Sequence, residues 1–200
     1  EDSRATGVQV GTEQLLFDVV VSAADLHHTE TRLLPPDRRT YDEPYFGKRD
    51  PGVSAVLVLC GVRGKLPQLD HHNLLFSREW DTDFDAVFAG PVTERPLSAS
   101  QSIYVSKPSA TDPSTAPASD ENLFVLVPAP SSAALGAGDA YGEGASASVQ
   151  AIADAALDQI AQWCDIPDLH ERIVVRKTVG PADFAARYHA WSGGAIGPAH

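Results

Sequence analysis

The sequence contains no methionine and only two cysteines in 200 residues. Cys60 and Cys164 stand far apart and form no CxxC pair. We therefore expect free thiols rather than a disulfide or a zinc site, which fits a reducing cytoplasm. The missing methionine predicts that the chain does not begin at its own start codon and is an internal piece of a longer protein.

Long apolar runs and an excess of basic residues are also missing. No stretch reaches the roughly 20 apolar residues that a helix needs to cross a bilayer, and no signal peptide opens the chain. Any membrane contact is therefore expected to be peripheral. The net charge of -12 argues against a nucleic-acid partner, because phosphate binding needs a concentrated basic face. An apolar content of 43% is enough for one sizeable core.

The central stretch 102–130 has the strongest pattern. Its ends, 103–105 and 123–127, are β-branched, aromatic or apolar runs that predict two strands, the second buried on both faces of a sheet. Between them, 107–120 holds three prolines among Ser, Thr and Asp, which predicts a long loop and no helix. A loop of this length is either functional or disordered.

Other apolar patterns complete an α+β prediction. Apolar runs predict a hairpin leading into a buried strand at 15–22, and further strands at 53–60 and 172–179. A helix-period stripe predicts a helix at 148–164, and Pro181 is suited to the first position of another. We therefore expect an α+β domain whose mixed sheet carries helices on one face.

Two short helical signals are weaker. In 78–88, Trp80, Phe84 and Phe88 recur at helical spacing, and we expect them in the core. Asp25 precedes the apolar stretch 26–34, where it suits the N-cap position of a helix.

Two motifs resemble chemical sites without fitting them. The pairs His27-His28 and His71-His72 invite a zinc site, but neighbouring residues on a strand point to opposite faces and no HExxH pattern accompanies them. We expect no metal. The GxGxxA match at 142–147 does not follow a strand directly, so we interpret it as a decoy for a dinucleotide fingerprint.

The segment 35–51 mixes cations and aromatics in an otherwise acidic chain. Such a mixture is typical of a solvated connection, yet it also suits a lipid headgroup surface, where rings enter the interface and cations meet anionic lipid. We expect peripheral membrane contact here. The residues concerned are Arg38, Arg39, Lys48, Arg49, Tyr41, Tyr45 and Phe46.

Several phrases together resemble one family. They span nearly the whole chain: DVVVSAAD at 18–25, QLDHHNLLF at 68–76, SIYVSKPSATDP at 102–113, ENLFVLVP at 121–128, and GPADF at 180–184 continuing to Trp191. In this order they resemble the bacterial phytoene desaturases, the FAD-dependent carotenoid desaturases of the flavin amine oxidase superfamily.

The resemblance implies a domain plan and a cofactor. Residues 1–25 would be the edge of the FAD-binding domain, 26–179 the substrate-binding domain, and 180–200 a helix and loop returning toward the FAD domain. The full-length enzyme would hold FAD. We expect none in this chain, because it lacks the glycine fingerprint that holds the pyrophosphate at a helix N-terminus. The isolated piece would then be inactive.

The resemblance also implies a reaction: stepwise desaturation of phytoene or a related polyene, with the flavin taking a hydride while a proton leaves the neighbouring carbon. A non-catalytic carrier of apolar ligands, or a carotenoid isomerase or saturase of the same superfamily, remains an alternative. The resemblance does not indicate an oligomeric state for this protein. The expected site residues are Ala23, Ala24 and Asp25 near the cofactor, His71, His72 and Trp191 at the substrate, and Arg78 and Asp112, chosen from position alone, as catalytic groups.

Overall fold

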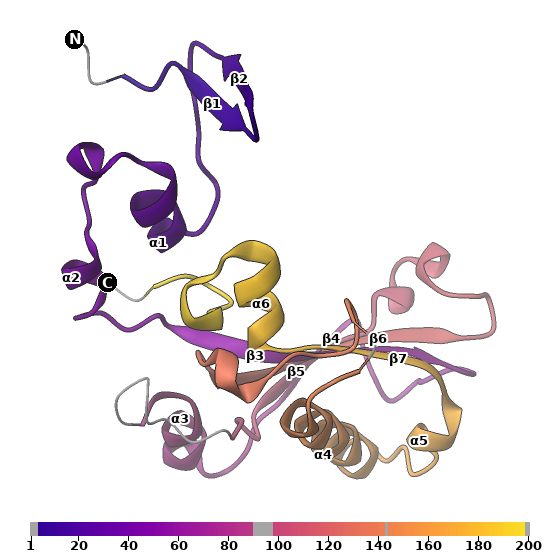
Figure 1. Cartoon of the computed structure of the whole chain (residues 1–200). Helices are drawn as coiled ribbons and strands as arrows, with labels where there is room; N and C mark the ends of the chain where they lie inside the picture. Colours follow the sequence, from indigo (N-terminus) through magenta and orange to yellow (C-terminus); the bar gives the residue numbers. More distant parts are fainter. Residues whose placement is uncertain (1–3, 90–97, 143, 199–200) are drawn as a thin grey trace.

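A computed structural model describes residues 4–89, 98–142 and 144–198. Its centre is a five-stranded sheet with the order β4-β5-β6-β3-β7, shown in Figure 1. The strands are β3 (Val53–Val62), β4 (His72–Leu75), β5 (Ile103–Ser106), β6 (Glu121–Pro130) and β7 (Ile173–Val179).

Every neighbouring pair in this sheet is antiparallel. The α+β prediction is confirmed, but the expected mixed sheet is wrong. The reason lies in the crossover after β6. The chain passes through α4 (Ala147–Trp163) and returns as β7, which lies beside β3 and therefore never pairs with β6.

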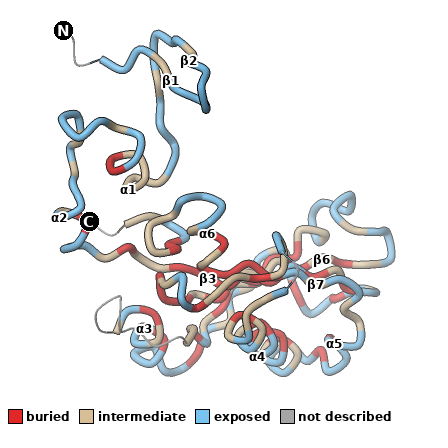
Figure 2. Tube along the Cα trace, viewed as in Figure 1, coloured by how far each residue is buried: buried red, intermediate tan, exposed pale blue. Residues whose placement is uncertain are grey.

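One face of the sheet is packed against helices. Val56 and Val58 of β3 and Val125 of β6 are fully buried in one core with Ala153 and Leu157 of α4. Figure 1 shows α3 (Trp80–Phe88), α4 and α5 (Leu169–Arg172) on this side. Figure 2 shows that the buried residues concentrate along β3 and on the inner side of α4.

The helix α6 (Pro181–Tyr188) lies on the opposite side of the sheet, over the start of β3 (Figure 1). Pro181 does open it, as predicted. The prediction that helices lie on one face of the sheet is therefore confirmed for α3, α4 and α5 only. Single turns occupy the connections: η1 (Thr29–Leu33), η2 (Pro36–Arg38), η4 (Pro108–Ala110), η5 (Pro113–Thr115), η6 (Ala133–Leu135) and η7 (Trp191–Gly193).

The N-terminal part stands apart from the sheet (Figure 1). The predicted hairpin forms from β1 (Gly7–Val10) and β2 (Glu13–Leu16). The buried strand expected through residue 22 is wrong: the chain leaves β2 at Leu16, and Val19 and Val21 are 76% and 83% exposed. A strand needs a neighbour to pair with, and the described residues supply none there.

Asp25 caps the next helix, as predicted. Its carboxylate accepts a hydrogen bond from the backbone N–H of His28 at 3.1 Å. The regular helix α1 (Leu26–His28) is short and continues into the wider turn η1. The short helix α2 (Glu43–Phe46) then leads toward β3.

Both cysteines are free, as predicted, among the residues described. Cys60 is buried in β3, and this burial raises the pKa of its thiol to about 11. A thiol with so high a pKa is a packing group and a poor nucleophile at neutral pH.

The aromatic residues of α3 are not in the core, so that prediction is wrong. Trp80 and Phe84 are 49% and 55% exposed. Asp83 and Val87 face inward instead. Helical spacing identified the shared face of the aromatics correctly, but the buried hydrogen-bond partners of Asp83 decide which face turns inward.

Asp83 attaches α3 to the sheet. Its carboxylate accepts hydrogen bonds from Ser77 Oγ at 2.7 Å, from the Gln101 backbone N–H at 2.7 Å and from Ser102 Oγ. Burial raises the pKa of this carboxyl, but the hydrogen bonds outweigh burial and hold the pKa below its usual value. The ionised form is therefore the one that stabilises the fold.

Replacing Asp83 with Asn should lower the free energy of unfolding at pH 7 by about 2 kcal/mol, because hydrogen bonds to a charged acceptor are lost. A carboxyl whose pKa is lowered in the folded state stabilises the fold at pH values above the usual carboxyl pKa. This contribution is lost as the pH falls through the lowered pKa. Urea unfolding of both proteins should show the difference at pH 7 and little of it in strong acid. The exposed neighbour Asp81→Asn is the matched control, and an Asp83→Asn deficit independent of pH would contradict this account.

Candidate functional site

The second face of the sheet is apolar and has little cover. Leu57, Leu126, Tyr104 and Leu74 stand opposite one another across β3, β6, β5 and β4. Along β6, buried residues alternate with half-buried ones, so the expectation that 123–127 is buried on both faces is wrong. We call this surface the open face; its residues are Leu57, Leu59, Leu74, Tyr104, Phe124, Leu126 and Val175.

Several open-face side chains reach solvent. Leu74 is 61% exposed, Val175 57% and Leu59 37%. Figure 1 shows α6 over one end of this side and the 107–120 loop at the other. An apolar sheet surface between two raised borders suits an elongated apolar molecule, because burying each exposed side chain is favourable by about 1.5–3 kcal/mol.

Four polar side chains gather at the loop end of the open face. His72 Nδ1 lies 2.6 Å from Tyr104 Oη, and His71 Nδ1 lies 2.6 Å from Thr111 Oγ1. The two imidazoles stack with ring centroids 4.2 Å apart. We call His71, His72, Tyr104 and Thr111 the polar cluster. The structure thus places both predicted substrate histidines in one group, next to an apolar surface.

A cavity of about 670 Å³ lies at the other border. We call it the α6 cavity. It brings together two segments far apart in sequence, and all three residues expected near the cofactor contribute to it. Its lining consists of Ala23, Ala24, Asp25, Leu26, Phe184, Tyr188, Ala190, Gly194, Ala195, Ile196, Gly197 and Pro198.

Asp25 joins the two walls of the α6 cavity. Besides capping α1, its carboxylate accepts a hydrogen bond from the Trp191 backbone N–H at 3.2 Å. The Trp191 indole stacks on the His27 ring at a centroid distance of 5.5 Å and meets Phe46 edge-on at 5.3 Å. Trp191, which was predicted to contact the substrate, therefore helps to hold the two walls of the α6 cavity together and does not belong to the open face.

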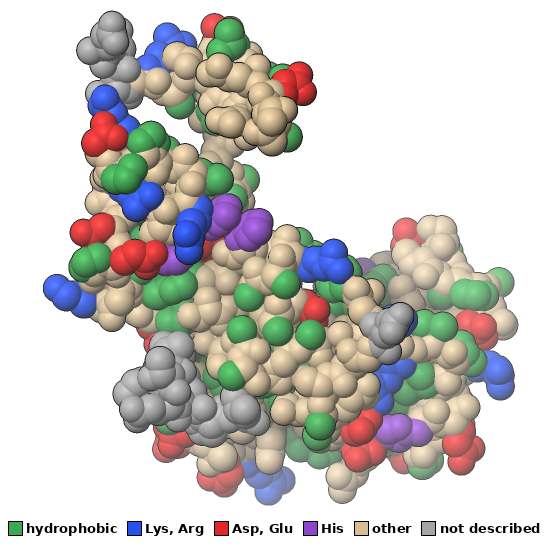
Figure 3. Space-filling view, in the orientation of Figure 1, with side chains coloured by type: hydrophobic (Ala, Val, Ile, Leu, Met, Phe, Trp, Pro, Cys, Tyr) green, Lys and Arg blue, Asp and Glu red, His purple; other side chains and the backbone are tan. Residues whose placement is uncertain are grey.

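A second aromatic contact also holds the two walls of the α6 cavity together. The rings of His28 and His189 stack in parallel, 4.1 Å apart. Burial and the neighbouring His189 lower the pKa of His28, despite the opposite influence of Asp25. The neutral form of His28 is thereby favoured, which avoids two positive charges on the stacked rings. Figure 3 shows histidine side chains gathered between the α1 segment and α6.

Neither of the two residues proposed as catalytic belongs to the polar cluster or lines the α6 cavity, although Asp112 follows Thr111 directly in the loop. Arg78 lines a separate cavity of about 550 Å³ with Phe76 and with Trp163 of α4, on the helix-covered side. Asp112 is exposed in the loop and caps η5. Hydrogen bonds from the Ser114 side chain and backbone lower the pKa of Asp112, so it is a weak proton donor at neutral pH.

The expected membrane segment 35–51 is largely engaged in internal contacts. Phe46 is 1% exposed, so its expected place in a lipid interface is wrong. Arg39 donates hydrogen bonds to the backbone carbonyls of Thr31 and Leu34. Arg49 lies over the Tyr45 ring at 4.2 Å. These contacts engage Phe46 and Arg39 within the fold, whereas Lys48 and Arg49 remain exposed.

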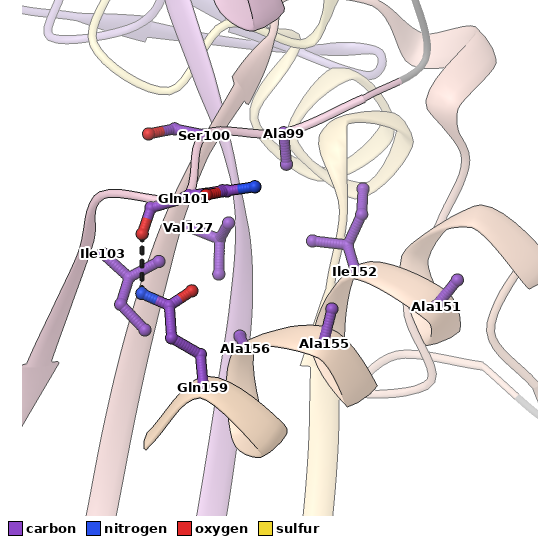
Figure 4. A pocket seen from close by; sticks show the side chains of 10 residues that line it. All are labelled: Ala99, Ser100, Gln101, Ile103, Val127, Ala151, Ile152, Ala155, Ala156 and Gln159. Carbon is purple, nitrogen blue, oxygen red and sulfur yellow. Dashed lines mark hydrogen bonds between the residues drawn. The ribbon is translucent and has the colours of Figure 1, made fainter. Parts of the chain in front are cut away.

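Another apolar hollow, of about 300 Å³, lies between α4 and β5. Figure 4 shows its lining, chiefly small side chains such as Ala151, Ala155 and Ala156, with Gln159 Nε2 donating to the Gln101 carbonyl at 2.7 Å. This hydrogen bond closes one end of the hollow. It is a gap in helix–sheet packing and contains no convergent polar groups of the kind that orient a substrate.

Within the residues described, no three His, Cys, Asp or Glu side chains are arranged to hold a metal ion. The GxGxxA match also lacks the required context in the described chain: β6 ends at Pro130, and η6 and coil precede α4, with Glu143 outside the described residues. No described helix combines the length and apolar composition needed to cross a bilayer.

No family model matches the chain. The chain is, however, similar to several characterised proteins. A carotenoid 3,4-desaturase of Haloarcula japonica is 38% identical over 184 residues, which are 92% of this chain and 34% of that protein. A zeta-carotene-forming phytoene desaturase of Myxococcus xanthus is 34% identical over 131 residues, 65% of this chain and 24% of that protein.

A third relative covers still more of the chain. A 4,4'-diapophytoene desaturase of Staphylococcus haemolyticus is 27% identical over 197 residues, 97% of this chain and 38% of that protein. The chain belongs to the carotenoid desaturase family. It spans between 24% and 38% of the length of these three relatives, so the geometry above corresponds to one portion of proteins of their length.

The sequence analysis named both histidines of the polar cluster, and it named Ala23, Ala24 and Asp25, which line one wall of the α6 cavity. It missed Tyr104, Leu57 and Leu126 as surface residues. Their signal is the two-residue period of the strands, but a run such as 123–127 is apolar at every position. Only the position of α4 shows which alternate residues are left on the open face.

Proposed function

We propose that this chain is the substrate-binding part of an FAD-dependent carotenoid desaturase that introduces double bonds into phytoene or a related polyene. The open face carries the proposal. Proteins that match the chain are named for action on carotenoids or their precursors, and a polyene hydrocarbon needs a long apolar surface. Leu57, Phe124 and Leu126 provide such a surface between α6 and the polar cluster.

The chain's own contribution is to hold and orient the polyene. Sheet residues have little freedom to move, so they fix the plane of an extended ligand. Covering the face with the ligand also removes water from it, which suits a reaction at an unactivated carbon. Here the bound flavin would accept the hydride, and the protein supplies position.

The residues present do not fit the pyrophosphate of FAD. In the described part of the chain Gly180 joins β7 directly to α6, but no further glycine follows it as the GxGxxG turn requires. The backbone N–H groups of Gly138 and Gly180 donate instead to the Asp183 carboxylate, at 2.6 and 2.8 Å. The small residues Ala23, Ala24 and Gly194 leave the wall of the α6 cavity open. We propose that this wall faces the cofactor while other parts of the full-length protein bind it, so that the isolated chain purifies without flavin.

The experiment places a charge on the open face of the full-length enzyme. Leu126→Asp should lower kcat/KM for the polyene at least about tenfold, because a carboxylate would have to be buried against hydrocarbon. Thermal unfolding should change little, since Leu126 is only half-buried. Leu33→Asp, at an exposed site far from the face, is the matched control. Unchanged turnover by Leu126→Asp would contradict the proposal.

We also propose that the enzyme meets the membrane at the periphery, through α3. Phe76, Trp80, Phe84 and Phe88 form a stripe of rings with successive centroids 5.2, 6.4 and 6.3 Å apart. Half-exposed aromatics of this kind suit the bilayer interface, where a polyene resides. The acidic neighbours Asp81 and Asp85 favour a zwitterionic over an anionic surface.

Vesicles of phosphatidylcholine test this stripe in the full-length enzyme. The double variant Trp80→Gln/Phe84→Gln should reduce the bound fraction about tenfold, because two rings no longer enter the interface. A variant with Arg38, Arg39, Lys48 and Arg49 changed to Gln should bind as wild type. The opposite pattern would return the docking surface to residues 35–51.

A further inference from the structure

Two histidine rings join distant parts of the chain beside the α6 cavity. His28 belongs to α1 and His189 is the residue after α6, and their rings stack with centroids 4.1 Å apart and planes inclined by only 7°. We call this pair the histidine stack. The same two helices supply Leu26 and Tyr188 to the cavity lining. The histidine stack therefore fixes how closely α1 approaches the end of α6.

The surroundings of the histidine stack disfavour positive charge. Burial is the largest influence and lowers the pKa of His28, followed by the neighbouring His189. Arg32 of η1 and His27 of α1 lower it further, and Asp25 opposes them. A proton on both rings would place two like charges about 4 Å apart, which repel strongly. Closure of the stack is therefore incompatible with full protonation.

The backbone that carries His189 is strained. His189 has a φ of 54°, and Ser192 and Gly193 follow with φ values of 55° and 76°. Residues with a β-carbon rarely adopt this left-handed region, and they remain there only where the surrounding structure holds them. Separation of the stacked rings would let this stretch relax.

A second contact between the same segments responds to acid in the opposite way. His27 Nε2 lies 3.0 Å from Glu43 Oε2 of α2, and the His27 ring stacks on the Trp191 indole. A proton on His27 strengthens both contacts, through a charge-assisted hydrogen bond and a cation–π interaction. The Trp191 backbone N–H is also bonded to Asp25. The Trp191 contact is therefore expected to persist in acid.

We propose that the histidine stack is a pH-sensitive latch of the α6 cavity, which holds the end of α6 against α1 at neutral pH and releases it in acid, with the Trp191 contact as the pivot. This inference goes beyond the binding of a polyene and does not depend on it. Release widens the α6 cavity on the side of Tyr188.

The direction of the response follows from the lowered pKa of His28. The closed form binds protons less readily than the open form, in which His28 regains the ordinary imidazole pKa of about 6.5. Protons therefore favour the open form. Closure is complete above the ordinary pKa and is lost as the pH falls below it.

The test measures the distance between two spin labels in the full-length protein at pH 7.5 and at pH 5. The labels are attached to Leu33→Cys in η1 and Ala186→Cys in α6, which are both exposed positions. Cys60→Ala and Cys164→Ser remove the two thiols of this chain, and any cysteine elsewhere in the full-length protein is replaced. With the histidine stack intact, the population at the longer distance should rise at least about tenfold on acidification.

Three variants distinguish the latch from a general loosening of the protein in acid. His28→Phe/His189→Phe keeps two rings that cannot be charged, so it should stay closed at both pH values. His189→Glu should reverse the response, because its carboxylate attracts protonated His28 and the shorter distance then predominates at pH 5. His170→Phe removes an exposed imidazole paired with Asp158; it is the matched control and should respond as wild type.

Each outcome bears on the proposal. An unchanged distance in wild type overturns it, and so does an equal response in the double Phe variant, because the charge on the stack would then be irrelevant. A reversed response of His189→Glu supports it. If the double Phe variant does not fold, the direction of the His189→Glu response decides alone.

Discussion

The pairing of β3 with β6 is the constraint on which the rest of the structure depends. Ten residues of each strand are in register, from Val53 opposite Pro130 to Val62 opposite Glu121. Side chains alternate across such a ladder, so a single register determines the core and the open face together. Val56, Val58 and Val125 meet α4, and their neighbours Leu57, Phe124 and Leu126 are thereby assigned to the ligand side.

The same ladder fixes the distance between the two borders of the open face. The α6 cavity adjoins the start of β3, where the Ala195 N–H donates to the Val53 carbonyl. The polar cluster is level with Leu59, because His72, Ser106, Phe124 and Leu59 are successive partners across the sheet. Six residues of strand separate the two levels, about 20 Å. An elongated ligand suits such a spacing.

Elements with purely local signals could be predicted from the sequence. The apolar stripe of α4, the Pro at the start of α6 and the cap at Asp25 depend on neighbours in the chain. The loop was identified from its prolines. Features that depend on distant partners could not be predicted. The burial of α3 is decided by Asp83 meeting Ser102, and the contact of His72 with Tyr104 requires the pairing of two strands.

Thiol labelling tests most directly whether the open face holds the polyene. Leu126→Cys would be placed in the full-length protein, and Leu33→Cys would report on a distant exposed site. Cys60→Ala and Cys164→Ser remove the two thiols of this chain, and any cysteine elsewhere in the full-length protein is replaced in the same background. Polyene well above its Kd should slow maleimide labelling at position 126 by at least about tenfold and leave position 33 unaffected. Labelling of Leu126→Cys at the same rate with and without bound polyene would contradict the account.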